Sequence, residues 1–182
     1  MRSQFDQIGS AVRSPPRPLI DSVSKLIVVY SPKSACTNLM AWFWQHIGEQ
    51  EAATAYGNPR HYRSIYCMSE RYRTALTDDL TKYIVVRVVR DPIERAASSF
   101  RHAIKTKYAD EDLRHVLGRT TADGLSFSEF IDYLERIDLT TTNIHHRYQR
   151  HPIEEVLPVR HLINITDENL YARLNEIEAL EG

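Results

Sequence analysis

The stretch VVYSPKSACTNLMAWFW at residues 28–44 decides the fold, because an apolar strand runs through a short polar turn into an amphipathic helix. The first backbone N–H groups of a helix have no partner within it and lie at the positive end of its macrodipole. A phosphate-like group could therefore be held at residues 33–38 with few side chains, and Lys33 would add a positive charge. The layout predicts an anion site, although a lysine after a strand is also common as a solvated loop charge.

The stretch YIVVRVVRDPIERAASSFRH at residues 83–102 repeats this layout. A β-branched strand leads to Arg90 and then to a helix with Asp91 as its expected N-cap and a proline in its first turn. Arg90 is thus placed at the carboxyl end of a strand, where open α/β sheets bind ligands. Ser98 lies about two helical turns further on and could share a phosphate with Arg90. The alternative interpretation is a surface ion pair of Arg90 with Asp91 or Glu94.

Taken together, the two loops resemble those of sulfotransferases that use 3′-phosphoadenosine 5′-phosphosulfate (PAPS). The family's 5′-phosphosulfate loop, Pro-Lys-x-Gly/Ala-Cys/Thr-Thr/Ser, stands here as Pro32-Lys33-Ser34-Ala35-Cys36-Thr37. Its 3′-phosphate loop, Arg-Asp-Pro-x-x-Arg-x-x-Ser-x-Phe, is matched by Arg90, Asp91, Pro92, Arg95, Ser98 and Phe100. The resemblance implies that PAPS is the co-substrate and that the residues binding it are Lys33, Ser34, Ala35, Cys36, Thr37, Asn38, Arg90 and Ser98.

The resemblance also implies a reaction, the transfer of a sulfuryl group to a hydroxyl acceptor. Lys33 is the expected catalytic residue that stabilises charge on the leaving phosphate, so no metal is expected. The acceptor needs a general base, for which His61 is the candidate between the two loops. Glu70 and the His145/His146 pair are the alternatives.

Two other functions remain open. A nucleotide kinase of the P-loop type is disfavoured, because the chain lacks both glycines of Gly-x-x-x-x-Gly-Lys-Ser/Thr and places its lysine first. A non-catalytic module that binds PAPS or its product would keep Arg90 and Ser98 without turnover. Ligand preference separates the kinase from the sulfotransferase, and turnover separates the binding module from both.

The order of strands and helices predicts an α/β fold. Strands are expected at residues 25–30, 83–89 and 159–166, with helices at 37–48, 70–80, 127–136 and 167–180. The helix at 127–136 begins at a Ser126/Glu129 capping box. The prediction is a three-layer α/β/α fold with a mostly parallel central sheet, similar to P-loop NTPases. Residues 1–22, rich in proline, are expected to form a flexible segment without regular structure, and residues 23–182 a single domain.

Composition limits the partners. The formal net charge of −1 gives no global attraction to nucleic acid, and none is expected as a partner. There is no run of about 18 apolar residues, so no transmembrane segment is expected. The two cysteines, Cys36 and Cys67, cannot form a disulfide framework, which favours a reducing, cytoplasmic location.

The acceptor is less clearly encoded. Residues 56–73 alternate aromatic and basic side chains, which could be a solvated helix face, an acceptor site for sugar rings, or a base-stacking surface. Asn143, His145 and Gln149 loosely resemble a segment of carbohydrate-type sulfotransferases. The chain also lacks the Gly-x-x-Gly-x-Trp-Lys segment of cytosolic small-molecule sulfotransferases, so a carbohydrate is the favoured acceptor. Residues 108–124 are expected to form a helix or a lid-like insertion.

Overall fold

The computed structural model describes residues 3–181, and the chain divides into two compact units. Unit 1 comprises Met1–Val89 and Gln149–Gly182, and unit 2 comprises Arg90–Tyr148. Unit 2 is therefore inserted in the sequence of unit 1 directly after the strand that precedes Arg90. The flexibility of residues 1–22 and the single domain over residues 23–182 stay predictions.

Unit 1 is built on a four-stranded sheet in the order β1-β2-β3-β4. The strands are β1 (Leu19–Asp21), β2 (Leu26–Tyr30), β3 (Ile84–Val89) and β4 (Val159–Asn164). β1 pairs with β2 antiparallel, whereas β2, β3 and β4 run parallel. The predicted α/β fold with a mostly parallel sheet is confirmed. The carboxyl ends of the adjacent strands β2 and β3 lead into the two predicted anion-binding loops.

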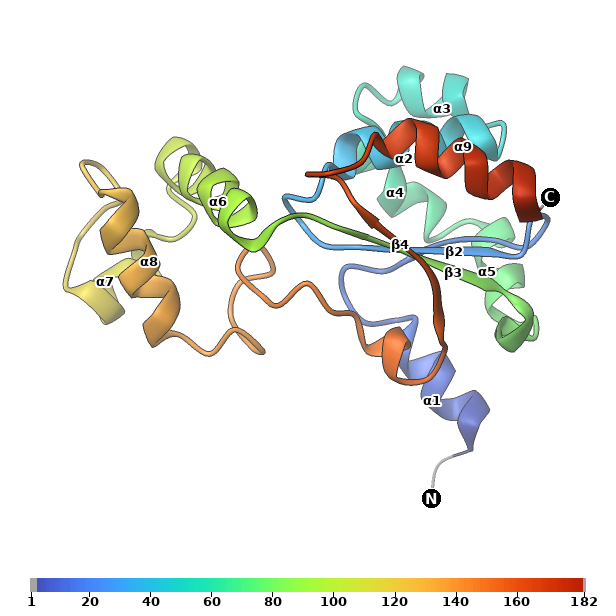
Figure 1. The fold of residues 1–182 in the computed structure, drawn as a ribbon, viewed down its shortest axis with the longest axis horizontal. Helices are drawn as coiled ribbons and strands as arrows, with labels where there is room; N and C mark the ends of the chain where they lie inside the picture. The colour runs from blue at the N-terminus through green and yellow to red at the C-terminus, as the bar shows by residue number, and fades with distance from the viewer. Residues whose placement is uncertain (1–2, 182) are drawn as a thin grey trace. The chain divides into compact units, whose positions relative to one another are not determined.

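Helices cover both faces of this sheet (Figure 1). One face carries α2 (Cys36–His46), α3 (Gln50–Ala55), α4 (Pro59–Tyr66) and α9 (Leu170–Glu181). The other face carries α1 (Gln4–Ala11) and the short 3₁₀ turn η2 (Pro152–Glu155). Between α4 and β3 the chain forms α5 (Glu70–Leu76) and η1 (Leu80–Lys82). The helix predicted over residues 70–80 ends at Leu76, because Asp79 caps the separate turn η1.

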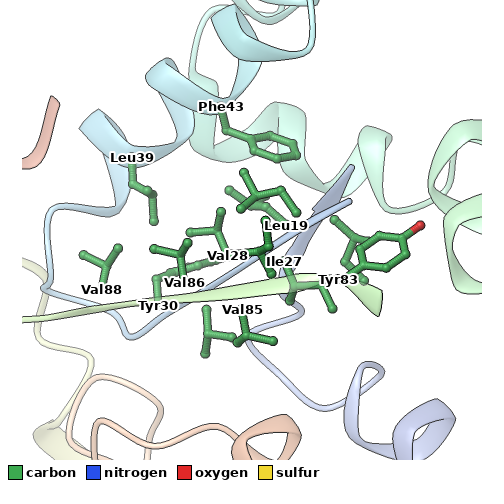
Figure 2. Close-up of a cluster of buried hydrophobic side chains, with 14 of the residues drawn as sticks. Leu19, Ile27, Val28, Tyr30, Leu39, Phe43, Tyr83, Val85, Val86 and Val88 are labelled. Carbon is green, nitrogen blue, oxygen red and sulfur yellow. The ribbon is translucent and has the colours of Figure 1, made fainter. Parts of the chain in front are cut away.

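The core lies between α2 and the sheet. Figure 2 shows Leu39 and Phe43 of α2 pointing toward the strands, with Val86 on the facing side of β3 and Val85 on the opposite side. Leu39 and Phe43 are fully buried. Truncating a buried phenylalanine to alanine costs about 3–5 kcal/mol, so this packing fixes α2, and with it the loop that begins it.

The expectation of no regular structure in residues 1–22 is wrong for two segments, and residues 1 and 2 lie outside the described residues. α1 begins at a capping box between Ser3 and Asp6, which satisfies the N–H groups of its first turn. β1 is only three residues long, but Leu19 and Ile20 are fully buried against the rest of the sheet. Tertiary packing thus orders a segment that local propensity leaves open.

Unit 2 contains three helices, α6 (Pro92–Thr106), α7 (Asp110–Leu117) and α8 (Phe127–Arg136). α8 has the bounds and the Ser126/Glu129 capping box that the sequence predicts. A separate apolar cluster holds the helices together, including the fully buried Leu113, Phe130 and Tyr133. The segment at residues 108–124 contains α7, so the helical part of that expectation is confirmed.

Candidate functional site

The anion loop, residues 33–38, connects β2 to α2 in unit 1. Lys33 and Ala35 have positive φ values of 72° and 55°. Left-handed backbone costs about 1–2 kcal/mol for each residue that carries a Cβ atom, and turns of this kind form concave nests of N–H groups that bind anions. Ala35 is also the N-cap of α2 and provides no side-chain cap. The predicted helix start is therefore present, in a strained backbone whose N–H groups suit an anion.

Two residues of the anion loop face inward. Ser34 is fully buried, and its hydroxyl donates a hydrogen bond to Gln149 Oε1 at 3.0 Å. The Cys36 thiol donates to the backbone carbonyl of Ser31 at 3.1 Å, and burial raises its pKa, so it remains a neutral thiol. We therefore expect the side chains of Ser34 and Cys36 to keep the loop rigid, whereas Thr37 and Asn38 are exposed.

Lys33 lies half-buried beside a second cation. Burial first, and then the positive charge of Arg60, together lower the pKa of Lys33 to about 8. Arg60 lies in the first turn of α4, where the Asn58 side chain accepts a hydrogen bond from its backbone N–H at 2.9 Å. The indole of Trp44 on α2 donates to the carbonyl of Pro59 at 2.9 Å, which holds the start of α4 against α2. The loop thus has two positive charges near it.

Sequence reasoning placed Arg60 in the aromatic and basic stretch but did not connect it with Lys33. The available signal was Asn58-Pro59, a helix-start pattern that fixes Arg60 in the first turn of α4. The predicted base His61 follows Arg60 in the same turn and is exposed, and the alternative Glu70 is exposed at the start of α5. The role of either as a base stays a prediction.

Two tyrosines of the stretch at residues 56–73 are buried, so none of the three interpretations of that stretch describes them. The rings of Tyr66 and Tyr72 are buried, and their hydroxyls donate to the carbonyls of Ile20 and Pro18 at 2.6 and 3.2 Å. Arg71 forms an ion pair with the buried Asp21 at 2.8 Å. The alternation of aromatic and basic residues therefore builds the contact between α4, α5 and β1.

The exposed members of that stretch are Tyr56, Arg60, His61 and Arg73. They are the part of it that remains available to an acceptor, and the choice among a solvated face, an acceptor site and a base-stacking surface stays open for them.

Arg90 begins unit 2, directly before α6. As predicted, Asp91 is the N-cap of α6 and accepts hydrogen bonds from the N–H groups of Ile93 and Glu94. The Arg90 side chain is about one quarter exposed, and its Nε lies 3.1 Å from Glu94 Oε2, so the ion pair considered from the sequence is present. Such partly exposed pairs contribute only about 0.3–0.5 kcal/mol, so a phosphate dianion can compete for this arginine. Ser98 is half-buried further along α6.

The histidines considered as alternative bases lie in a cluster within unit 2. His146 is buried, with Nδ1 at 3.2 Å from the hydroxyl of Ser99, and its ring stacks on Tyr108. His145 is half-buried, and its Nδ1 lies 2.9 Å from Asn143 Oδ1. His145 is thus the more accessible of the pair, and the role of either as a base stays a prediction. Tyr108 contacts both rings, and sequence reasoning missed it because residues 108–124 carry no motif.

No group of three or more His, Cys, Asp or Glu side chains that could hold a metal ion occurs within residues 3–181. Among the same residues, no helix has both the length and the apolar character needed to cross a membrane.

The α/β sheet thus has two adjacent parallel strands, β2 and β3, that are each followed by a basic residue and a helix. A sequence model of the sulfotransferase family matches residues 16–156, well over half of the chain and including both loops. The protein belongs to the sulfotransferase family, as a member similar to sulfotransferase family 2. No curated protein and no solved structure matches the chain. Family membership supports sulfuryl transfer as the general activity.

Proposed function

We propose that the protein transfers a sulfuryl group from PAPS to a hydroxyl of a carbohydrate acceptor. The observation that carries this proposal is the anion loop, in which two left-handed residues precede an uncapped helix start and Lys33 lies close to the charge of Arg60. Backbone N–H groups and two cations in a partly desolvated loop suit a phosphosulfate. We also propose that the fold is related to that of P-loop NTPases, because the loop follows a parallel strand in the same way.

The donor's two charged ends are assigned to different residues. The 5′-phosphosulfate is proposed to bind the N–H groups of residues 33–38 together with Lys33 and Arg60. The 3′-phosphate is proposed to bind Arg90 and Ser98, where the guanidinium forms charge-assisted hydrogen bonds to phosphate oxygens. The 3′-phosphate is the group that PAPS and its product share and that the common 5′-nucleotides lack, so Arg90 would determine donor specificity.

In the proposed reaction the acceptor oxygen forms a bond to sulfur as the bond between sulfur and the bridging phosphate oxygen breaks. The electron pair of that broken bond remains on the 5′-phosphate, and the acceptor proton passes to a base. Lys33 would stabilise the charge that develops on the leaving phosphate. Without a metal in this scheme, alignment and electrostatic stabilisation carry the catalysis.

The proposed base is His61, supported by its place beside Arg60 in the first turn of α4. Glu70 and the His145/His146 pair remain the alternatives, and single substitutions of the four residues identify the base by the loss of turnover with donor binding retained. The carbohydrate acceptor rests on the loose match of Asn143, His145 and Gln149 to carbohydrate-type enzymes. The two free thiols support a cytoplasmic location for the proposed enzyme.

Calorimetric titration of the wild-type protein with adenosine 3′,5′-bisphosphate, 5′-AMP and ATP with magnesium tests the donor. The proposal predicts the tightest binding for adenosine 3′,5′-bisphosphate, the product that carries both phosphates. Preference for ATP with magnesium would contradict it and favour the kinase alternative. Release of the bisphosphate from PAPS when a panel of carbohydrates is added then separates an enzyme from a binding module, which would bind the nucleotide without turnover.

A further inference from the structure

A hydrogen bond joins the anion loop to a residue 115 positions further along the chain. The hydroxyl of Ser34 donates to Gln149 Oε1 at 3.0 Å, and the Ser34 side chain is fully buried. Gln149 is the first residue of unit 1 after the inserted unit 2. The contact therefore fixes the middle of the loop from a segment that is remote in sequence.

The anion loop needs such support because its backbone is strained. Ser34 lies between Lys33 and Ala35, which both adopt positive φ values although neither is glycine. Strained conformations persist where surrounding contacts over-determine them. Within the loop, the N–H of Ser34 and the thiol of Cys36 both bond to the carbonyl of Ser31. The bond to Gln149 ties this local turn to a separate part of unit 1.

The segment that carries Gln149 is itself held in place. His151 is buried, and one of its ring nitrogens lies 3.1 Å from the backbone carbonyl of Ser14. Its backbone N–H donates to Glu154, which also forms an ion pair with Arg87 of β3. Burial lowers the pKa of His151, so the ring remains neutral near pH 7. Gln149 thus lies two residues before His151, which caps the anchored turn η2.

We propose that Gln149 is a positioning residue for the donor: through Ser34 it holds the anion loop in the conformation that binds the 5′-phosphosulfate. This inference rests on the proposed function and adds a residue to it. Gln149 acts on the 5′ end of the donor and not on the 3′-phosphate. Its loss therefore weakens ligands with a 5′-phosphate selectively, whereas a general structural defect weakens all nucleotides alike.

The test is calorimetric binding of adenosine 3′,5′-bisphosphate and of 3′-AMP, which lacks the 5′-phosphate. Gln149→Met keeps the length of the side chain and removes the acceptor, and Ser34→Ala removes the donor. Each substitution is expected to weaken the bisphosphate about three- to tenfold, the range for one hydrogen bond, and to leave 3′-AMP unchanged. The double variant should be no weaker than the single variants, because both remove one contact.

Gln50→Met, on an exposed glutamine at the start of α3, is the matched control and should bind both nucleotides like wild type. Equal weakening of both ligands by Gln149→Met, or additive losses in the double variant, would overturn the inference. If Gln149→Met does not fold, Ser34→Ala alone carries the same comparison of ligands. A wild-type protein that binds no bisphosphate at all would instead refute the proposed function.

Discussion

The anion loop of unit 1 presents backbone N–H groups, whereas the start of α6 in unit 2 presents a side chain. In the loop, strained residues are held by the buried Ser34 and by the partly buried Cys36. At α6, Asp91 caps the helix and Arg90 forms a partly exposed pair with Glu94. Anion binding by the loop should therefore depend on the backbone conformation, whereas binding by Arg90 should depend on its charge. Substitutions in the loop should disturb both fold and function, and substitutions at Arg90 only function.

Lys33→Ala should give the largest effect. Its charge matters most as the leaving phosphate becomes negative, so the turnover number with PAPS should fall about 10²–10³-fold, the cost of losing one preorganised stabilising group. Affinity for adenosine 3′,5′-bisphosphate should fall less. Steady-state kinetics and calorimetry on the same preparations measure the two quantities, with Lys105→Ala on α6 as an exposed control. Equal losses in rate and affinity would place Lys33 in ground-state binding only.

Ala35→Val tests whether the anion loop depends on its left-handed backbone conformation. A β-branched side chain fits poorly at a φ of 55°, so the free energy of unfolding should fall by about 1–2 kcal/mol and bisphosphate binding should weaken with it. Ala52→Val on the exposed surface of α3 is the matched control, and its cost should be limited to helix propensity. Urea unfolding of both variants measures the difference. A cost at Ala35 no larger than at Ala52 would show that the loop conformation is not constrained.

The pH dependence of kcat/KM tests whether the charge of Lys33 is needed. Since the pKa of Lys33 is about 8, Lys33 carries its charge at pH 7 and loses it as the pH rises through 8. The kcat/KM for PAPS should therefore decline above about pH 8, because this parameter reports ionisation in the free enzyme. Lys33→Arg keeps a charge that does not titrate in this range, and its profile should lack that decline. A decline that persists in Lys33→Arg would belong to another group.

Glu94→Ala should give the smallest effect. Removing the carboxylate leaves Arg90 with its charge, so bisphosphate binding should stay equal or tighten by no more than about twofold. The free energy of unfolding should change by less than about 0.5 kcal/mol, the value of a pair at this helical spacing. A large loss of affinity on titration would mean that Glu94 orients Arg90 for the ligand.

Elements with local signals could be predicted from the sequence, and α8 is the clearest case. Its capping box and helical spacing are both contained in residues 126–136. β1 could not be predicted, because its order comes from pairing with β2 and burial of Leu19 and Ile20. α1 was missed although Ser3 and Asp6 form a capping box, since the prolines that follow pointed to an irregular segment.

The candidate site likewise contains residues that the sequence predicts and contacts that it does not. Arg90 follows β3 directly and Lys33 lies three residues after the end of β2, so their positions at strand ends could be predicted. The link between Ser34 and Gln149 spans 115 residues and leaves no pattern in a single sequence. No local pattern marks Tyr66 and Tyr72 as inward, because the partners of their hydroxyls are backbone carbonyls of a distant segment.

The central claim is that Arg90 binds the 3′-phosphate, and the most direct test compares adenosine 3′,5′-bisphosphate with 5′-AMP on Arg90→Ala. Arg101→Ala, an exposed arginine on the same helix, is the control. Losing a charge-assisted contact worth about 1.5–3 kcal/mol should weaken the bisphosphate tenfold or more. Binding of 5′-AMP and the thermal unfolding midpoint should stay unchanged. Unchanged bisphosphate affinity, or equal losses for both nucleotides, would contradict the claim.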